Sequence, residues 1–532
     1  MKYPIFIILI LILGYQCIAQ EASIAPISID FVNWKSTKNN RTVIIPTPIK
    51  PHFTKHIKNT KELPSSYDLR TENLVSPVKD QANCGACWMF TSMASIESNW
   101  LLNGYGMYDL SEQSLKNCHG FAKNGCEGGN HLYTTAYLMR GDGPILENEV
   151  PYNVSDTICN KNYSPVKQIS EAVFLPPDPE IIKQAILDYG ALYTSMYFKN
   201  ISYNTFSNSY YYNGDEPVNH GVTLIGWDDN KSTQGGTGAW LAKNSFGTNW
   251  GANGYFYISY NDSKILSDNA CFPKTEEYQI EKTIYQYDAL GWITNIGYGN
   301  DAAHALIKYK ASDNQKITKV GTYICSENAS AQVSVYYGKN QDELIYEIGK
   351  SDMQYFDFPG FYWIELNNPV RISKGETFYI KVKYKTPGYN YPIPLEAEVE
   401  DYSYPSIEQN VCWISKNTSR WETIGYNIKE MQVDLCIKAY AIPAKDSVVS
   451  DEHIIISPNP FNRYLEIGFG NPIQKNFIIT IFNTNGQSVY SKKFSSETEI
   501  YQLRLDLPQL RNGIYYLDIT GDIQYSQRII KL

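Results

Sequence analysis

The sequence predicts a multidomain chain in which one α+β domain is followed by two all-β domains. Three observations support this prediction. The chain has 532 residues, whereas a single domain usually has about 150. Between residues 63 and 272, helical patterns come first and alternating, Gly-punctuated strands follow, which is the order of an α+β domain. From residue 283 onward apolar and polar residues alternate, as in strands with one buried face.

The N-terminus predicts export from the cytosol. Lys2 precedes an apolar run from Ile5 to Gly14 and then the small-residue stretch "CIA", which is the order of a secretory signal peptide. We expect cleavage after Ala19, so residues 1–19 are the signal. Residues 20–62 are interpreted as a short pro-segment or linker, because they are polar and show no sustained helical or strand period. The net charge of −9, without a basic block, argues against nucleic acid as a partner.

Two strand-rich regions follow the α+β domain. Segments such as "QVSVYYG" and "FYIKVKYK" alternate within residues 283–441 and predict a β-sandwich. A polar break at residues 442–453 is interpreted as a linker, and residues 454–532 are again strand-like. Asn485 and Gly486 predict a hairpin turn in this last region, because an Asn-Gly pair suits the backbone of a tight turn.

The cysteines indicate one reactive thiol. Thiols outside the cytosol oxidise and pair. Of the 10 cysteines, Cys17 leaves with the signal, and the odd number that remains predicts a free thiol. Cys87 is the candidate because it begins a helical pattern whose apolar residues share one face and which Gly104 can end. A helix N-terminus favours a thiolate, so we expect a lowered pKa for Cys87.

Three further residues complete a catalytic arrangement around Cys87. Only one of three histidines in this domain, His220, lies in a strand-like frame, "VNHGVTLIGWDD", which could hold an imidazole as the base. The amide oxygen of Asn244 could fix the tautomer of that imidazole. Gln81 could donate to an oxyanion together with the backbone N–H of Cys87. The other two histidines are His119 and His131.

Five segments resemble, in their order, the papain-like cysteine peptidases: "QANCGACW", "LSEQSLKNC", "CEGG", "NHGVTLIGW" and "KNSFGTNWGANGYFYI". The resemblance covers residues 63–272 and implies a papain-like α+β fold, with a helical left lobe and a β-barrel-like right lobe. It implies catalytic roles without a cofactor or metal: Cys87 as nucleophile, His220 as acid and base, Asn244 as orienter and Gln81 as oxyanion donor.

The resemblance also implies disulfides from Cys84 to Cys126 and from Cys118 to Cys159. Four other cysteines would then form two more pairs of unknown connectivity: Cys271, Cys325, Cys412 and Cys436.

The sequence departs from the family pattern at three places. Phe246 replaces the tryptophan that usually shields the bond between histidine and asparagine, and we expect activity to survive because a ring remains. The pro-segment is shorter than the inhibitory one typical of the family, so latency is unexplained. His131 stands where the family usually lines an apolar substrate pocket, so the substrate preference cannot be transferred.

Less specific interpretations compete for some of these residues. Cys84 and Cys87 have the spacing of a redox pair, but that interpretation leaves the histidine and asparagine segments unexplained. His119 and His131 lie near cysteines and could suggest zinc, although surface histidines are the better interpretation. Glu97 is expected to be a structural acid. Turn residues are expected at Asp228 and Asp229.

The two β domains carry further resemblances, of which the first is softer and the second rests on a specific order of motifs. The region that begins "TIYQYDALGWITN" resembles a lectin-like domain found after papain-like domains in secreted microbial proteins. Its aromatic residues could stack on sugars, pack in a core, or belong to a domain that only docks on the peptidase: Tyr362, Trp363, Tyr389, Tyr391, Trp413 and Trp421. The tail, with "SPNPFNRYLEI" and "LPQLRNGIYYLDITG", resembles the C-terminal sorting domain of type IX secretion cargo in Bacteroidota.

The sequence therefore predicts a papain-like cysteine endopeptidase that is secreted or held at the cell surface. Its expected partners are protein or peptide substrates, carbohydrate through the lectin-like domain, and the secretion machinery through the tail. Two alternatives stay open. The first is a catalytically idle adhesin or glycan-binding protein on a papain scaffold. The second is a transpeptidase, which would transfer the acyl group to an amine instead of water.

Overall fold

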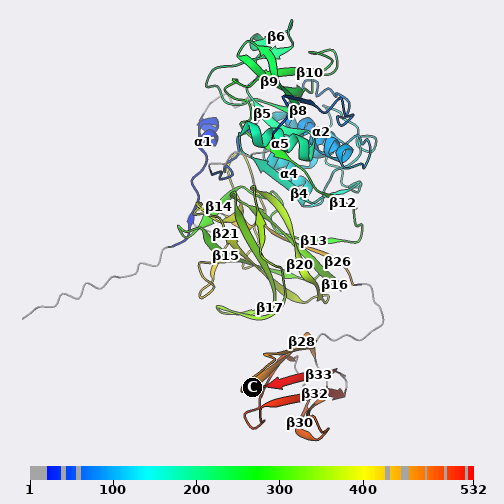
Figure 1. The fold of residues 1–532 in the computed structure, drawn as a ribbon, viewed down its shortest axis with the longest axis vertical. Coiled ribbons are helices and arrows are strands. Elements are labelled where there is room, and N and C mark those ends of the chain that lie inside the picture. The colour runs from blue at the N-terminus through cyan, green and yellow to red at the C-terminus, as the bar shows by residue number, and fades with distance from the viewer. Residues whose placement is uncertain are drawn as a thin grey trace, which may run out of the picture.

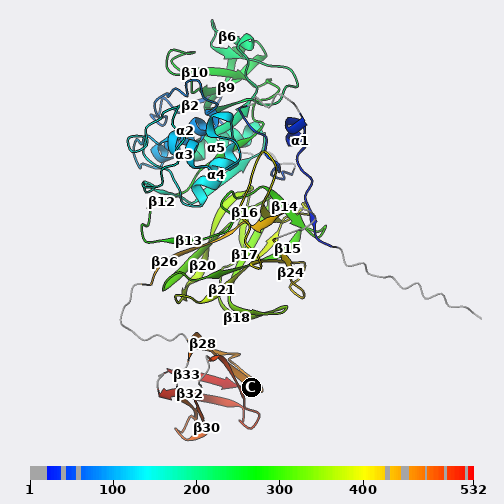
Figure 2. The same ribbon diagram turned by 180° about the vertical axis from the view of Figure 1, so that it is seen from behind.

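The computed structural model describes residues 21–36, 43–54, 62–425, 432–444, 454–473, 476–495, 500–521 and 525–532. Figures 1 and 2 show a helical first domain lying directly on a β domain, with a smaller β domain beyond it. The expected signal peptide lies outside the described residues, as does most of the expected linker. No helix of the described ranges is long and apolar enough to cross a membrane.

The helices of the first domain pack around α2, Cys87–Leu102. The sequence suggested one apolar face, but Cys87 to Trp100 are buried on all sides, as expected of a helix at the centre of a core. Side-chain caps begin the neighbouring helices: Ser111 accepts from the N–H of Ser114, and Asn130 accepts from two backbone amides. The other helices are α3 Glu112–Cys118, α4 His131–Met139 and α5 Pro179–Tyr189.

One long sheet runs through the first and second domains. Ala172 of β4 pairs with Phe361 of β20, which joins the two domains by backbone hydrogen bonds. The second domain therefore docks on the first, which was one of the alternatives that the sequence left open. The strands follow the order β13 (Thr283–Tyr285), β26 (Ile437–Pro443), β16 (Gln315–Ile324), β20 (Gly360–Ile372), β4 (Glu171–Leu175), β11 (Asn269–Cys271), β5 (Leu192–Met196), β8 (His220–Thr233), β9 (Gly236–Lys243), β10 (Tyr255–Ser259), β7 (Ser209–Tyr210) and β6 (Tyr203–Asn204), with β2 (Ser66–Asp68) on β8.

The second domain adds a second large sheet and confirms the expected all-β architecture. Strand β21 alternates buried and more exposed residues, as its sequence "TFYIKVKYK" predicts. Its sheet has the order β18 (Glu343–Lys350), β17 (Ala329–Asn340), β21 (Thr377–Lys385), β15 (Ala302–Lys310), β23 (Cys412–Ser415) and β24 (Glu422–Ile424), with β19 (Gln354–Phe356) on β17. Two small sheets complete this part: β1 (Ser23–Ile24), β14 (Thr294–Gly297), β22 (Ile393–Ala397), β25 (Val433–Leu435); and β12 (Thr275–Glu276), β3 (Gln168–Ile169).

The third domain is a small β-sandwich with its own hydrophobic core. The expected turn at Asn485 and Gly486 joins β29 to β30, and Gly486 has a positive φ of 77°. Its two sheets are β27 (Ile454–Ser457), β28 (Tyr464–Ile473), β31 (Ile500–Asp506); and β30 (Ser488–Phe494), β29 (Phe477–Asn483), β32 (Gly513–Gly521), β33 (Tyr525–Lys531).

The N-terminal segment is more ordered than its composition predicts. Residues 23–24 pair with β14 of the second domain, and α1 spans Ile29–Ser36. Phe31 and Trp34 are buried, and the ring of Phe31 meets the ring of Tyr402 edge-on at 5.5 Å. The prediction of no regular structure was wrong because eight residues and two aromatic anchors are too few to show a period.

The cysteines pair only in part as expected. The disulfides Cys84–Cys126 and Cys118–Cys159 are confirmed. The expectation of two further pairs was wrong, since the remaining four cysteines are free and buried. Two of these thiols donate hydrogen bonds to other groups: Cys325 to Asn295 Oδ1 at 3.1 Å and Cys412 to Asp434 Oδ1 at 3.7 Å.

Thiol counting tests this arrangement. We expect protein lacking residues 1–19, alkylated without reductant, to react negligibly while native, because all five free thiols are buried. After unfolding in guanidinium, intact mass should show five modifications, at Cys87, Cys271, Cys325, Cys412 and Cys436. A single modification in the unfolded state would restore the four-disulfide prediction.

Candidate active site

Cys87 lies where the first turn of α2 meets the first residues of β8. The side chain is fully buried, and the backbone N–H of Gly221 donates to Cys87 Sγ at 3.3 Å. As the sequence predicts, Cys87 is the first residue of its helix, so unpaired helix amides surround the sulfur. Donors that lie close to a sulfur in this way stabilise a thiolate when it forms.

A β-hairpin brings His220 and Asn244 together. His220 is the first residue of β8, and Asn244 follows the end of β9, the strand that pairs with β8. His220 Nε2 lies 2.8 Å from Asn244 Oδ1. Phe246 stacks on the imidazole, with ring centroids 4.9 Å apart and planes inclined by 28°. The phenylalanine therefore covers the ring at the position where the family has tryptophan.

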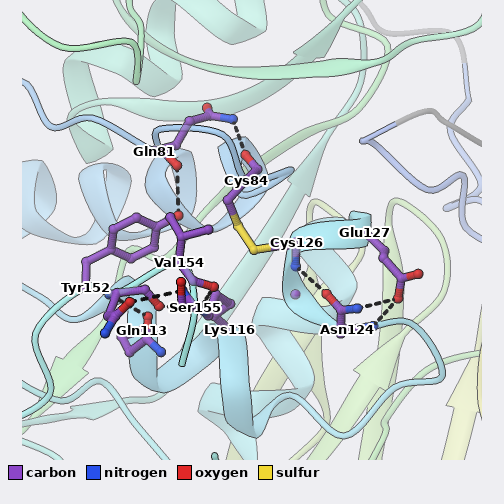
Figure 3. Close-up of a disulfide and its surroundings, with 12 residues drawn as sticks. Gln81, Cys84, Gln113, Lys116, Asn124, Cys126, Glu127, Tyr152, Val154 and Ser155 are labelled. Atoms are coloured by element: carbon purple, nitrogen blue, oxygen red, sulfur yellow. Dashed lines mark hydrogen bonds between the residues drawn. A yellow bond between two sulfur atoms is a disulfide. The ribbon is translucent and has the colours of Figure 1, made fainter. Parts of the chain in front are cut away.

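Gln81 is held beside the disulfide Cys84–Cys126, as Figure 3 shows. Its side-chain N–H donates to the carbonyl of Cys84 at 2.8 Å, and its Oε1 accepts from the Ser245 hydroxyl at 2.6 Å. An amide nitrogen has two hydrogens, so one remains for another acceptor. Because Ser245 follows Asn244 in sequence, the same turn positions Gln81 and the orienting asparagine.

The disulfide excludes the redox interpretation. The sulfur of Cys84 is bonded to Cys126, so it does not pair with Cys87. The N–H of Gly85 donates to the carbonyl of Cys126 at 3.0 Å, and a Cβ on Gly85 would lie only 2.4 Å from that oxygen. The glycine between the two motif cysteines is therefore needed for this close approach.

Burial dominates the electrostatics of the site. Desolvation raises the pKa of the Cys87 thiol to about 12, although hydrogen bonds from backbone amides act in the opposite direction. Desolvation also lowers the pKa of His220 to about 4, although the hydrogen bond that His220 donates to Asn244 Oδ1 acts in the opposite direction. The expectation of a lowered thiol pKa was wrong for this state, because helix-terminal donors do not offset complete burial. Near pH 7 both groups are neutral.

Residues 43–45 contribute to that burial. The N–H of Ile45 donates to the carbonyl of Gly129 at 3.0 Å, and the N–H of Gly129 donates to the carbonyl of Val43 at 3.0 Å. Ile44 is 1% exposed and lies against Gly221, the residue whose amide contacts the sulfur. Gly129 itself packs on Trp88, whose ring a Cβ would meet at 2.5 Å. The N-terminal segment therefore covers the candidate thiol.

A buried cluster of charged residues forms around Glu97 of α2. Glu97 is fully buried and accepts from Ser76 Oγ at 2.5 Å, from Lys79 Nζ at 3.1 Å and from the N–H of Leu110 at 2.9 Å. Lys79 also bonds Glu112 at 3.0 Å. Glu97 is a satisfied structural acid, as predicted, and takes no part in the candidate catalytic group.

Two other sequence interpretations are corrected. His119 and His131 are 4% and 3% exposed, so neither is a surface histidine, because aromatic rings enclose both. The nearby cysteines Cys118 and Cys126 are oxidised and provide no thiolate for zinc. Asp228 and Asp229 lie within β8, where Asp229 pairs with Lys183 at 2.6 Å, so they are not turn residues.

Three family models match the chain in succession. Residues 63–280 match "Papain family cysteine protease", residues 284–441 match "Lectin like domain", and residues 456–532 match "Secretion system C-terminal sorting domain". Residues 63–280 are therefore a papain-family cysteine peptidase domain, and the predicted three-part architecture is confirmed. The sorting domain assigns the protein, through the type IX pathway, to the cell surface or the extracellular space.

Relatives support the same assignment. The chain is 32% identical over 216 residues to a cathepsin L-like peptidase of Aedes aegypti, covering 40% of this chain and 61% of the relative. It is 30% identical to cathepsin L2 of Homo sapiens, covering 37% and 61%. The chain thus spans about three fifths of the length of these relatives. The fold matches the cysteine protease and lectin-like domains of Cwp84, a surface layer associated protein of Clostridium difficile, with a TM-score of 0.70, 23% identity, and coverage of 80% and 98%.

Displacing the covering segment should expose the thiol. We expect Ile44→Asp to raise the rate of Cys87 alkylation at pH 8 at least about tenfold, because a carboxylate is too costly to bury against Gly221. Modified protein identified by peptide mass spectrometry gives the rate. The matched control is Ile29→Asp, since Ile29 lies on the same segment and is 68% exposed. Equal rates in both variants would show that residues 43–45 do not limit access.

Proposed function

We propose that the protein is a secreted cysteine endopeptidase that hydrolyses peptide bonds through a thioester on Cys87. The observation that carries this proposal is the hydrogen bond of 2.8 Å between His220 and Asn244. His220 directly precedes Gly221, whose backbone N–H donates to Cys87 Sγ. Nucleophile, imidazole and orienting amide come from a helix, a strand and the end of a second strand. Such a group activates a thiol for attack on a carbonyl carbon.

The proposed reaction has two stages. The Cys87 thiolate attacks the peptide carbonyl, the carbon–nitrogen bond breaks, and His220 passes its proton to the leaving amine. Water then attacks the thioester while His220 takes up one of its protons, which releases the carboxylic acid and restores the Cys87 thiolate beside protonated His220. The second amide hydrogen of Gln81 and the backbone N–H of Cys87 are the proposed donors to the oxyanion in both stages.

Latency is part of the proposal. Residues 20–62 act as a pro-segment whose residues 43–45 cover Cys87 and keep both catalytic groups neutral through desolvation. Removal of the segment lets water approach, which lowers the pKa of the thiol and raises the pKa of the imidazole. The two groups can then exist as a thiolate and an imidazolium. A short segment is sufficient because it contacts the site directly.

The adhesin alternative has weaker support. Of the aromatic residues considered for sugar stacking, Trp363 and Trp421 are 6% and 7% exposed, and Tyr389 stacks on His52. These rings pack within the protein and do not present open faces. Transpeptidation shares the thioester, so analysis of the products with an added amine nucleophile distinguishes it from hydrolysis.

Kinetics of single and double variants test the mechanism. With the pro-segment removed, Cys87→Ala and His220→Ala should each abolish peptide hydrolysis, and the double variant should be scarcely worse, because the two act as a unit. Asn244→Ala should be milder, since it misorients the base without removing it. Gln81→Ala should lose on the order of 10²–10³ in kcat. Cys271→Ala, at another buried thiol of this domain, is the matched control and should stay active. Hydrolysis by purified Cys87→Ala protein would defeat the assignment.

The tail gives a separate prediction. Deleting Asp451 to Leu532 should leave the protein in the periplasm of a host with the type IX pathway, because residues 456–532 form the sorting domain. Immunoblots of periplasm, cell surface and medium measure the distribution, with the full-length chain as control. Unchanged amounts outside the cell would show that the tail does not direct export.

A further inference from the structure

Asp268 is a largely buried carboxylate in the peptidase domain that the proposed mechanism does not use. Its side chain is 10% exposed. Asp268 Oδ2 accepts from the hydroxyl of Ser195 at 3.0 Å. Asp268 Oδ1 accepts from the ammonium of Lys50 at 2.5 Å. The remaining carboxylate near that ammonium, Asp30, lies 3.8 Å away on a side chain that is 62% exposed, so Asp268 is the main partner of Lys50.

This carboxylate lies close to the candidate nucleophile. Ser195 of β5 pairs directly with Gly221 of β8, and the N–H of Gly221 donates to Cys87 Sγ. The N–H of Ser195 in turn donates to the carbonyl of Asp268 at 3.1 Å. Neighbouring strands are about 4.8 Å apart, so two strand spacings place Asp268 roughly 10 Å from β8. A substrate bound at Cys87 can reach that far with one long side chain.

Two polar groups near Asp268 lack hydrogen-bond partners. His131 Nδ1 and the hydroxyl of Tyr193 are buried and have no hydrogen-bond partner within the described ranges. Their rings are neighbours, with centroids 5.6 Å apart. Burial raises the pKa of Tyr193 well above its usual value, and the negative charge of nearby Asp268 acts in the same direction. Unpartnered buried polar atoms favour a polar occupant over an apolar one.

Lys50 belongs to the segment that must leave before a substrate can bind. Once it leaves, Asp268 loses its cation and keeps only the hydroxyl of Ser195, so its negative charge faces the opened cleft and attracts a cationic group. His131 does not replace the cation, because desolvation lowers its pKa to about 4 and the imidazole is neutral at pH 7. A cation has to come from the molecule that takes the place of the segment.

We propose that Asp268, together with Ser195 and His131, forms an acidic subsite that selects substrates with a basic side chain within three residues of the cleaved bond. Lys50 of the pro-segment occupies this acidic subsite in the latent protein. Because Ser195 uses one carboxylate oxygen, a single-point ammonium fits better than a bidentate guanidinium, and lysine is preferred to arginine. The inference rests on the proposed peptidase function and names its substrate class.

Matched peptides test the acidic subsite. A peptide-library digest with the activated protein should enrich lysine near the cleaved bond, and the best sequence is then compared with the same peptide carrying uncharged norleucine instead of lysine. Asp268→Asn should lower kcat/KM for the lysine peptide on the order of 10- to 100-fold and leave the norleucine peptide within about threefold. Asp229→Asn is the matched control, since Asp229 also binds a lysine at 2.6 Å but on another part of β8. It should change neither value.

Three outcomes decide the question. Equal cleavage of both wild-type substrates would overturn the acidic subsite and leave the peptidase proposal standing. No cleavage of any peptide would overturn the peptidase proposal. The subsite is then judged by calorimetry with Cys87→Ala protein freed of the pro-segment, where the lysine peptide should bind at least about tenfold more tightly than the norleucine peptide. If Asp268→Asn fails to fold, the wild-type ratio of lysine to norleucine cleavage decides alone.

Discussion

The contact between the start of α2 and the start of β8 is the constraint on which the site depends. It places Cys87 against the backbone of Gly221, the residue that directly follows His220 at the start of β8. The helix is buried on nearly all sides, and its single buried acid, Glu97, is fully satisfied. Packing and polar satisfaction together hold the nucleophile in place.

The burial at this contact also determines the charge of both candidate catalytic groups. Complete burial moves the pKa of the thiol upward and that of the imidazole downward, so the ion pair that the chemistry requires does not form. Helix-terminal donors and the orienting asparagine are already in position, but they act on neutral groups.

Local features of the sequence predicted much of the site. The helix at Cys87, the strand at His220 and the order of the motifs are encoded within short windows, and a ring at Phe246 covers the histidine as its position suggested. What could not be predicted depends on residues far apart in sequence. The buried state of His131 needs Phe174 and Tyr193, and the partner of Asp268 is Lys50, more than two hundred residues earlier. Periodicity carries no information about such contacts.

The sheet that joins the two larger domains links these separate parts. Strand β11 begins directly after Asp268 and pairs with both β4 and β5. Strand β4 pairs on its other edge with β20 of the lectin-like domain, while β5 carries Ser195 and pairs with the strand of His220. The pairing of Phe361 with Ala172 therefore holds β4 against β20, and β4 in turn pairs with β11, the strand that begins next to the acidic subsite. Since Trp363 and Trp421 of the lectin-like domain are buried, this structural support follows more directly from the contacts than recognition of sugars by these two rings does.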